Sequence, residues 1–146
     1  MTDDAARIAR NKETVRQFLA AVPDQDRAAM GATLAEDAAM HYQRPSLPND
    51  SGAKPIPCLR GREAILDDLG THIFQLFRRG TIRVTIESVI AEGDQVAVQW
   101  IMAAMTVRRN EPYENFYSFY FRLRDGKITD FWEYLDTLYA SKLLFS

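Results

Sequence analysis

The sequence predicts one α+β domain, with helices first and a largely antiparallel sheet after them. Apolar residues recur at helical spacing up to about residue 79, and strand-like segments separated by short turn signals follow. This order of elements favours α+β over an alternating α/β arrangement. The 146 residues, 47% hydrophobic and 26% charged, have the size and composition of a single globular domain, 1–146.

Three helices are expected in the N-terminal half, over 5–22, 26–34 and 61–79. In each segment, apolar residues recur three or four positions apart, so that one helix face can be buried. Pro23 ends the first helix because proline lacks an amide proton and fixes φ. A short strand is expected between the second and third helices, at 38–43.

The segment 44–59 has a different composition from its neighbours. It contains Pro45, Pro48, Pro55 and Pro57 within a short stretch. Because proline removes a backbone donor, this segment fits neither a central strand nor a helix. A loop of this length in a compact domain is commonly a lid or a binding loop, and we expect a lid-like loop here.

Four further strands form the C-terminal half, and we expect them over 81–91, 95–107, 113–124 and 127–137. Their residues are rich in β-branched and aromatic types. The pairs Gly93-Asp94 and Asp125-Gly126 supply turns between consecutive strands. Short turns of this kind join antiparallel neighbours, so the strands are expected to form a meander.

The last hairpin admits two registers. A two-residue loop pairs Arg124 with Lys127, and a three-residue loop with Gly126 in the left-handed region pairs Leu123 with Lys127. We expect the three-residue loop because it sorts the hairpin into one apolar face and one mixed face, which a slip of one residue would exchange. The apolar face, expected to be buried, carries Asn115, Tyr117, Phe119, Phe121, Leu123, Phe131, Glu133 and Leu135.

Glu133 stands out on this face. It is flanked by Phe131 and Leu135 and, in the expected register, lies directly across from Tyr117. Removing water from a carboxylate favours its neutral form and raises its pKa, which suits general acid/base chemistry. The alternative is a glutamate at a strand end whose carboxyl reaches water or caps a neighbouring backbone group.

The mixed face of the hairpin carries four large aromatic residues, Phe116, Tyr120, Trp132 and Tyr134, beside charged ones. Large aromatic side chains on an outer sheet face imply a cover. A second copy of the chain, related by a twofold axis, is the expected cover. The sequence therefore predicts a homodimer through the outer sheet face.

Composition and charge narrow the class of protein. The net charge is −2 and the Lys and Arg residues are scattered, so the sequence shows no basic patch that would bind nucleic acid. No apolar run approaches the roughly 18 residues of a membrane span, and the acidic N-terminus does not resemble a signal peptide. The single cysteine allows neither an internal disulfide nor a cysteine metal cluster. We expect a soluble cytoplasmic protein without a metal, a nucleic acid partner or a membrane partner.

Several motifs resemble those of the SnoaL-like branch of the nuclear transport factor 2-like superfamily. ENFY (114–117), RDGKI (124–128) and EYLD (133–136) are similar to its C-terminal hairpin, and LAEDA (34–38) and GREAI (61–65) to its second and third helices. With the order of elements, the resemblance spans nearly the whole chain. It is specific for the fold and weak for the activity, because this superfamily has many unrelated functions.

The resemblance implies a cone-shaped α+β barrel of the cystatin-like type. In it, three N-terminal helices pack in a strongly curved, mixed and mainly antiparallel sheet around a ligand cavity, and dimers are frequent. Enzymes of the superfamily include ketosteroid isomerase, limonene epoxide hydrolase, scytalone dehydratase and polyketide cyclases. None of these needs a metal or an organic cofactor, so no cofactor is expected here.

The catalytic positions of these enzymes match this sequence only in part. The base aspartate of ketosteroid isomerase falls on Tyr42, a poor base at neutral pH. The arginine and aspartate of limonene epoxide hydrolase fall on Trp100 and Met102, so that pair is absent. The acid/base aspartate of polyketide cyclases falls on Glu133, and this match survives. The histidine pair of scytalone dehydratase is not expected from the two histidines of the chain, one of which is His72.

The first functional hypothesis is an enzyme that acts on a small, apolar, cyclic molecule by cyclisation, isomerisation or dehydration. Glu133 would move the proton, and Tyr117 and Asn115 would hydrogen-bond a carbonyl or enolate oxygen. The expected substrate-binding residues are Tyr42, Trp100, Met102, Phe119, Phe131 and His72. Two alternatives remain: a non-catalytic protein that binds such a ligand, and a dimeric assembly module whose own side chains fill the cavity.

Overall fold

The computed structural model describes residues 2–41 and 58–146 and contains one mixed sheet. Its strands are β1 (Leu34–His41), β2 (Cys58–Arg60), β3 (Arg83–Glu92), β4 (Gln95–Met105), β5 (Pro112–Arg124) and β6 (Lys127–Leu135). Across the sheet their order is β2-β1-β6-β5-β4-β3. Neighbouring strands are antiparallel, except that β1 and β6 run parallel.

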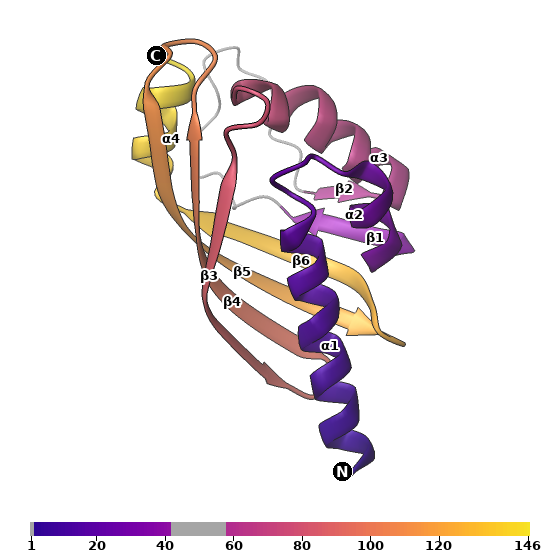
Figure 1. The fold of residues 1–146 in the computed structure, drawn as a ribbon. Coiled ribbons are helices and arrows are strands. Elements are labelled where there is room, and N and C mark those ends of the chain that lie inside the picture. Colours follow the sequence, from indigo (N-terminus) through magenta and orange to yellow (C-terminus); the bar gives the residue numbers. More distant parts are fainter. Residues whose placement is uncertain (1, 42–57) are drawn as a thin grey trace.

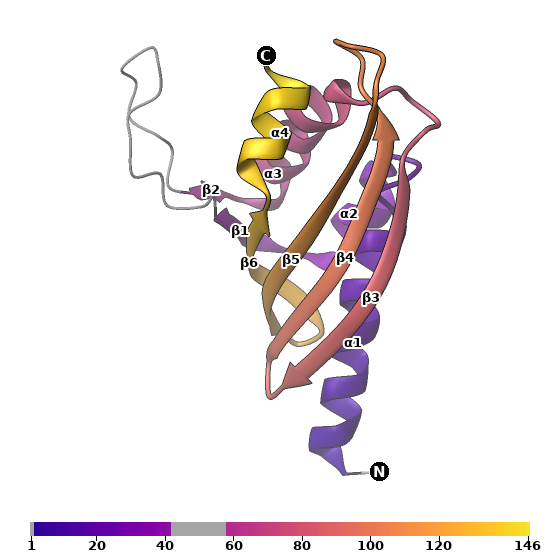
Figure 2. The ribbon, with the colours of Figure 1, turned by 90° about the vertical axis from the view of Figure 1, so that its left-hand side faces the viewer.

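The helices are α1 (Asp3–Ala20), α2 (Arg27–Thr33), α3 (Arg62–Asp68) and α4 (Thr137–Leu144). The first three lie on one side of the sheet, whose long strands β3 to β6 curve around them (Figure 1). The fourth lies beside β5, at the same end of the domain as α3 (Figure 2). This arrangement confirms the predicted α+β class, with three N-terminal helices in a curved, mixed and mainly antiparallel sheet.

The first helix has strong local signals at its start. The Thr2 hydroxyl accepts a hydrogen bond from the amide of Ala5, and Asp3 and Asp4 place negative charge at the positive end of the helix dipole. Further along, Phe18 faces the sheet and contacts the aromatic rings of β5 and β6. The amphipathic spacing seen in the sequence therefore fixes which helix face closes the core.

The third helix is shorter than predicted, and the expectation of one helix over 61–79 is wrong in its second half. After α3 the chain forms a wider π-helical turn at Leu69–Ile73 and a tighter 3₁₀ turn at Phe74–Leu76. Phe77 then pairs with Thr106 as an isolated bridge at the sheet edge. The change of winding rotates the apolar side chains of this segment toward the interior of the domain.

The turn between β5 and β6 has two residues, so the predicted three-residue loop is wrong. Arg124 pairs with Lys127. Asp125 and Gly126 take φ values of 51° and 75°, the left-handed pair of a type I′ turn. This turn follows the right-handed twist of the strands better than the expected loop does.

A bulge one step further along restores the predicted faces. Pairing passes from Leu123 opposite Ile128 to Arg122 opposite Asp130, so that Thr129 is an extra residue in β6. The Thr129 hydroxyl donates a hydrogen bond to the carbonyl of Arg122 at 3.2 Å. Beyond the bulge the apolar face of the hairpin is the buried one, as predicted.

The cross-strand partners on that face differ from the expected ones. Glu133 lies opposite Phe119, and Tyr117 lies opposite Leu135. The predicted direct pairing of Glu133 with Tyr117 is therefore wrong. The shorter turn and the bulge each shift the pairing by one residue relative to the expected register. Together they shift it by two residues, so each side chain stays on its predicted face but lies opposite a different partner.

The C-terminal helix was not expected, because the last strand was extended to residue 137. β6 ends at Leu135, and the carboxylate of Asp136 accepts the amide of Tyr139 at 3.0 Å and so caps α4. Asp136 is thus a structural residue.

The predicted lid-like loop, 44–59, lies mostly outside the described residues. Its last two positions, Cys58 and Leu59, belong to β2, which pairs antiparallel with β1. Those two positions are therefore part of the sheet and not of a loop. Tyr42 also lies outside the described residues.

The core lies between α1 and the inner sheet face. Its most deeply buried large side chains include Leu19 from α1, Phe121 from β5, and Phe131 from β6, each without measurable exposure. Phe18 packs against both phenylalanines, with ring centroids 5.9 and 5.4 Å away. Within 2–41 and 58–146, no helix combines the length and apolar character that crossing a membrane requires.

Candidate functional site

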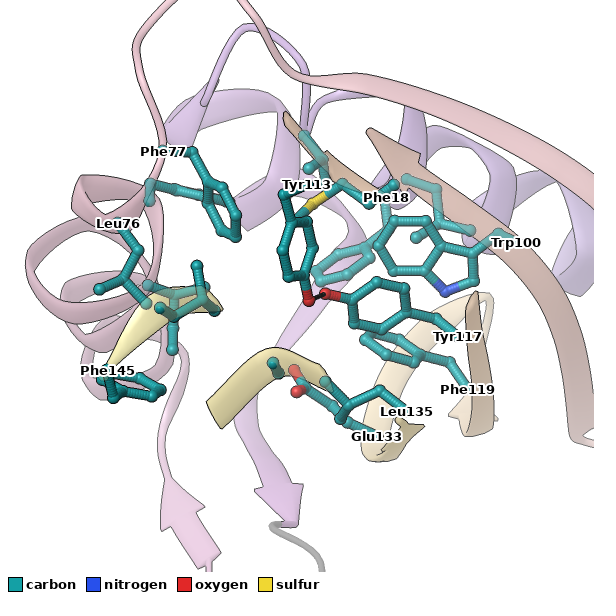
Figure 3. Close-up of a pocket in the computed structure, with 17 residues that line it drawn as sticks. Phe18, Leu76, Phe77, Trp100, Tyr113, Tyr117, Phe119, Glu133, Leu135 and Phe145 are labelled. Atoms are coloured by element: carbon teal, nitrogen blue, oxygen red, sulfur yellow. Dashed lines mark hydrogen bonds between the residues drawn. The ribbon is translucent and has the colours of Figure 1, made fainter. Parts of the chain in front are cut away.

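A cavity of about 170 Å³ opens between the inner sheet face, the helical turns after α3, and the C-terminal helix (Figure 3). Apolar side chains make up most of its wall. They are Phe18, Leu19, Val22, Ile73, Phe74, Leu76, Phe77, Met102, Phe119, Leu135, Ala140, Leu144 and Phe145. A cavity of this size accommodates a molecule of about one ring.

Four described wall residues carry a polar group on an otherwise apolar lining: Glu133, Tyr113, Tyr117 and Trp100. In Figure 3 the carboxyl of Glu133 and the two tyrosine hydroxyls face the same space. None of the described wall residues is cationic. The site therefore offers one acid and two phenol hydroxyls in apolar surroundings.

Glu133 reaches the cavity from β6. Among the residues that the structure describes, no side chain or backbone group hydrogen-bonds its carboxyl. Loss of water around the carboxyl, together with the negative charge of Asp68, raises the pKa of Glu133 from 4.5 to about 7. At neutral pH the group is then present in both forms, so it can give or take a proton.

Tyr113 and Tyr117 form a hydrogen-bonded pair on β5, with their hydroxyl oxygens 2.7 Å apart. Asn115, between them on the same face, donates its amide to the Tyr113 hydroxyl at 2.9 Å. Burial raises the pKa of both tyrosines, so both stay protonated. Whichever hydroxyl donates within the pair, the other O–H proton remains for a group in the cavity.

Trp100 forms part of the wall from β4. Its indole stacks on Tyr117, with centroids 4.6 Å apart, and meets Phe119 edge to face at 5.1 Å. The side chain is 4% exposed, and its Nε1–H has no acceptor among the described residues. Buried indole N–H groups normally have a partner.

Five residues predicted for the site lie on the cavity wall: Tyr117, Trp100, Met102, Phe119 and Glu133. They come from three adjacent strands, β4 to β6, and from alternate positions on each. Side chains alternate between the two faces along a strand, so residues that are correctly predicted to point inward from neighbouring strands lie on the same wall.

Three other predicted residues lie elsewhere. Asn115 is buried but satisfied: its amide also donates to the carbonyl of Asp136, and its oxygen accepts the amide of Phe116, so it is not free for a ligand oxygen. Phe131 lies behind the wall in the core. His72 points to solvent and pairs with Asp68 at 3.0 Å, because the π-helical turn rotates it off the apolar face.

Sequence reasoning missed Tyr113 and the contribution of the C-terminal helix. Tyr113 has the same strand parity as Tyr117, so the alternation itself was a signal for it. Leu144 and Phe145 close the cavity from beyond the last strand. Their signal was the capping pattern of Asp136 before a run of helix formers.

The outer sheet face carries the aromatic residues predicted for a dimer interface. Phe116 and Tyr134 are 60% and 50% exposed. Trp132 is partly covered by its own chain: His41 stacks on it at 4.3 Å, and the Arg122 guanidinium lies 5.3 Å from its ring. Tyr120 packs on the same tryptophan at 5.4 Å.

No three acidic, histidine or cysteine side chains gather into a metal site within the described part of the chain. The polar groups that face the cavity, one carboxyl and two phenols, are proton-transfer and hydrogen-bonding groups. The arrangement is suited to acid/base chemistry or to binding a ligand with oxygen acceptors.

Fold and site together define a small α+β protein of the nuclear transport factor 2-like type, with its cavity on the inner face of the curved sheet. The sequence profile of the SnoaL-like domain matches residues 15–131. The chain belongs to this SnoaL-like family. No curated protein sequence matches it significantly.

Solved structures with the same fold extend over nearly the whole chain. A protein described as a SnoaL-like polyketide cyclase from Jannaschia sp. CCS1 is 18% identical, with a TM-score of 0.79, and the match covers 99% of this chain and 97% of that one. TerC co-crystallised with polyporic acid is 20% identical, with a TM-score of 0.76 and coverage of 94% and 99%.

A third neighbour was solved in complex with trimethylamine. It is a protein with a ketosteroid isomerase-like fold from Catenulispora acidiphila DSM 44928, 21% identical, with a TM-score of 0.65 and 84% of each chain covered. At these identities the similarity establishes the fold.

Proposed function

We propose that this protein is a cofactor-independent enzyme that transfers a proton on a small cyclic ketone or enol inside the cavity. Glu133 is the proposed acid/base, and the Tyr113–Tyr117 pair binds the substrate oxygen. The observation that carries the proposal is a partly buried carboxyl with a pKa near 7 on an apolar wall. Cyclisation, isomerisation and dehydration all begin or end with such a transfer.

The chemistry follows from the groups on the wall. The carboxylate form of Glu133 takes a proton from the carbon next to a carbonyl. The electron pair of that C–H bond forms a carbon–carbon double bond, and the π pair of the carbonyl moves to its oxygen. A tyrosine O–H donates to this oxygen and stabilises its developing charge. The protonated carboxyl then returns the proton to carbon, so the enzyme ends in its starting form.

Proton exchange tests this step without knowledge of the natural substrate. In D2O, the protein should replace the α-protons of cyclohexanone with deuterium, as followed by proton NMR. Glu133→Gln should lower the catalysed rate by at least about 100-fold, the usual contribution of a positioned general base. Glu114→Gln, an exposed carboxyl on the opposite face of β5, is the matched control and should exchange normally.

The pKa of Glu133 is the companion measurement, by carbon-13 NMR titration of its carboxyl. A value near 7 supports the proposal. A value near 4.5 together with no exchange would contradict it.

A non-catalytic ligand-binding role is the second candidate, favoured by how much of the wall is apolar. The structural neighbours crystallised with polyporic acid and with trimethylamine support a ligand role for this fold. Tight binding of cyclohexanone with no deuterium incorporation would favour this role. A cavity of about 170 Å³ argues against the assembly module, whose interior would be filled.

The exposed outer face supports a homodimer as the working form. Phe116 and Tyr134 would be covered by a second copy. In sedimentation velocity the protein should have the mass of two chains, and Phe116→Ser with Tyr134→Ser should shift it to one chain. Leu138→Ser, at an exposed apolar residue of α4 and not on the sheet, is the control and should remain dimeric.

A further inference from the structure

Glu133 is an acid without a counterion on the wall of the cavity. Within the part of the chain that the structure describes, no group hydrogen-bonds its carboxyl, and none of the wall residues is Lys, Arg or His. Asp68 adds a negative charge that acts on the same carboxyl. When Glu133 ionises, its charge is therefore uncompensated by the described wall, which is an unfavourable state for a desolvated carboxylate.

The wall around this carboxyl is largely aromatic. Phenylalanine, tyrosine and tryptophan rings reach it from α1, β4, β5 and the end of the chain (Figure 3). Such a wall tolerates an ammonium group better than an aliphatic wall does, because the faces of aromatic rings carry negative partial charge. The hydroxyl oxygens of Tyr113 and Tyr117 face the same space as the carboxyl and can accept an N–H hydrogen bond.

We propose that the cavity binds small organic cations, an ammonium group on a single apolar ring, with Glu133 as the counterion. The ammonium group donates to the carboxylate, and the ring packs against the apolar wall. Folding has already removed water from the carboxylate, so binding adds only the desolvation of the ammonium group. This inference goes beyond the proposed function, because the ligand is a cation and no bond is made or broken.

Two probes of one shape test the proposal: cyclohexylammonium and the uncharged cyclohexanol. By isothermal titration calorimetry at about pH 8, Glu133→Gln should bind cyclohexylammonium at least about ten-fold more weakly than the unchanged protein does. Its affinity for cyclohexanol should change by less than about three-fold, the effect of one neutral hydrogen bond. Glu114→Gln, at an exposed carboxyl, should bind both probes as the unchanged protein does. An equal change for both probes in Glu133→Gln would overturn the proposal.

Binding of the cation should also depend on pH, because only the ionised carboxyl attracts it. With a pKa near 7, about 1% of Glu133 is ionised at pH 5 and most of it at pH 8. The titratable groups that interact with Glu133, directly or through a partner, are Asp68, His72, Tyr113, Tyr117 and Tyr139. Burial raises the pKa of Tyr113 and Tyr117, so neither phenol ionises in this range.

The affinity for cyclohexylammonium should therefore fall at least about ten-fold from pH 8 to pH 5, whereas the affinity for cyclohexanol should not fall. His72→Gln is the control for the exposed histidine that pairs with Asp68, and it should keep this pH dependence. An affinity for cyclohexylammonium that is the same at both pH values would overturn the proposal.

A third measurement needs no variant. Saturation with cyclohexylammonium should lower the pKa of Glu133, from near 7, by at least about one unit, as a nearby opposite charge does. Cyclohexanol should not lower it. Carbon-13 titration of the Glu133 carboxyl with each probe measures the difference, and an unchanged pKa with bound cyclohexylammonium would overturn the proposal.

The two proposals fail separately. If cyclohexanone shows no deuterium incorporation but cyclohexylammonium binds in a manner that depends on Glu133, the proton-transfer function fails and the cation site stands. If deuterium exchange proceeds and Glu133→Gln binds cyclohexylammonium as tightly as the unchanged protein does, the cation site fails alone.

Discussion

The hydroxyls of Tyr113 and Tyr117 lie 2.7 Å apart, on the first and third of three consecutive inward positions of β5. The residue between them, Asn115, donates to Tyr113 at 2.9 Å and to the backbone carbonyl of Asp136 at 3.0 Å. Asp136 also caps α4, the helix that closes the cavity. The tyrosine pair and the start of α4 are thus held by the same buried amide.

This arrangement predicts that the two tyrosines contribute unequally to stability. Tyr113→Phe leaves one N–H of the buried Asn115 amide without an acceptor and should lower the free energy of unfolding by about 1–2 kcal/mol. Tyr117→Phe leaves the Tyr113 hydroxyl free to face the cavity and should cost less than about 1 kcal/mol. Urea denaturation of both variants checks this order. The reverse order would show that Asn115 does not depend on Tyr113.

The faces of the last hairpin could be predicted from the sequence, because burial there follows a strict alternation. Phe119, Phe121 and Phe131 are buried, whereas Phe116 is exposed, as the alternation requires. Three strands with the correct parity were enough to bring Trp100, Tyr117 and Glu133 to one cavity.

The individual pairs on that face could not be predicted. They depend on the bulge at Thr129, and nothing in the local sequence distinguishes a bulge from a longer turn with the same parity. The rotation of His72 away from the cavity depends likewise on the π-helical turn, which tertiary packing selects over the regular helix that the spacing favours. Tyr113 was missed although its parity pointed inward.

Asp68 is predicted to influence the pKa of Glu133 through its charge. Its negative charge contributes to the raised pKa of Glu133, so Asp68→Asn should lower that pKa. Asp67→Asn is the matched control, since Asp67 is largely exposed and pairs with Arg27. Carbon-13 titration of the Glu133 carboxyl in the two variants measures the difference. A larger shift in the Asp67 variant would contradict the prediction.

Glu133 should make the stability of the fold depend on pH. Its pKa is raised in the folded state, from 4.5 to about 7, so the folded protein holds this proton more tightly than the unfolded chain. Below both pKa values Glu133 is protonated in the folded and in the unfolded chain, so it does not affect the free energy of unfolding. Stability falls as the pH rises between them, and above pH 7 the full cost of roughly 2–3 kcal/mol applies, allowing for partial exposure.

Glu133→Gln removes this cost and is the test. The variant should match the unchanged protein at about pH 4 and should be more stable at about pH 8, with the difference developing between the two pKa values. Urea denaturation across this range measures it. A constant difference between the two proteins at every pH would mean that the carboxyl is not desolvated.

Removing the bulge should leave the faces of β6 unchanged. With Thr129 deleted, Asp130 follows Ile128 directly, so a regular ladder keeps Asp130 opposite Arg122 and Phe131 opposite Phe121, on the faces that they have now. The deletion loses the hydrogen bond from the Thr129 hydroxyl to the Arg122 carbonyl, as Thr129→Ala does, so each variant should lower the free energy of unfolding by about 1 kcal/mol or less. Urea denaturation measures both losses, and carbon-13 titration of Glu133 in the deletion variant should give a pKa still near 7. A pKa near 4.5 in the deletion variant, together with a much larger loss of stability than in Thr129→Ala, would mean that the deletion has turned Glu133 outward.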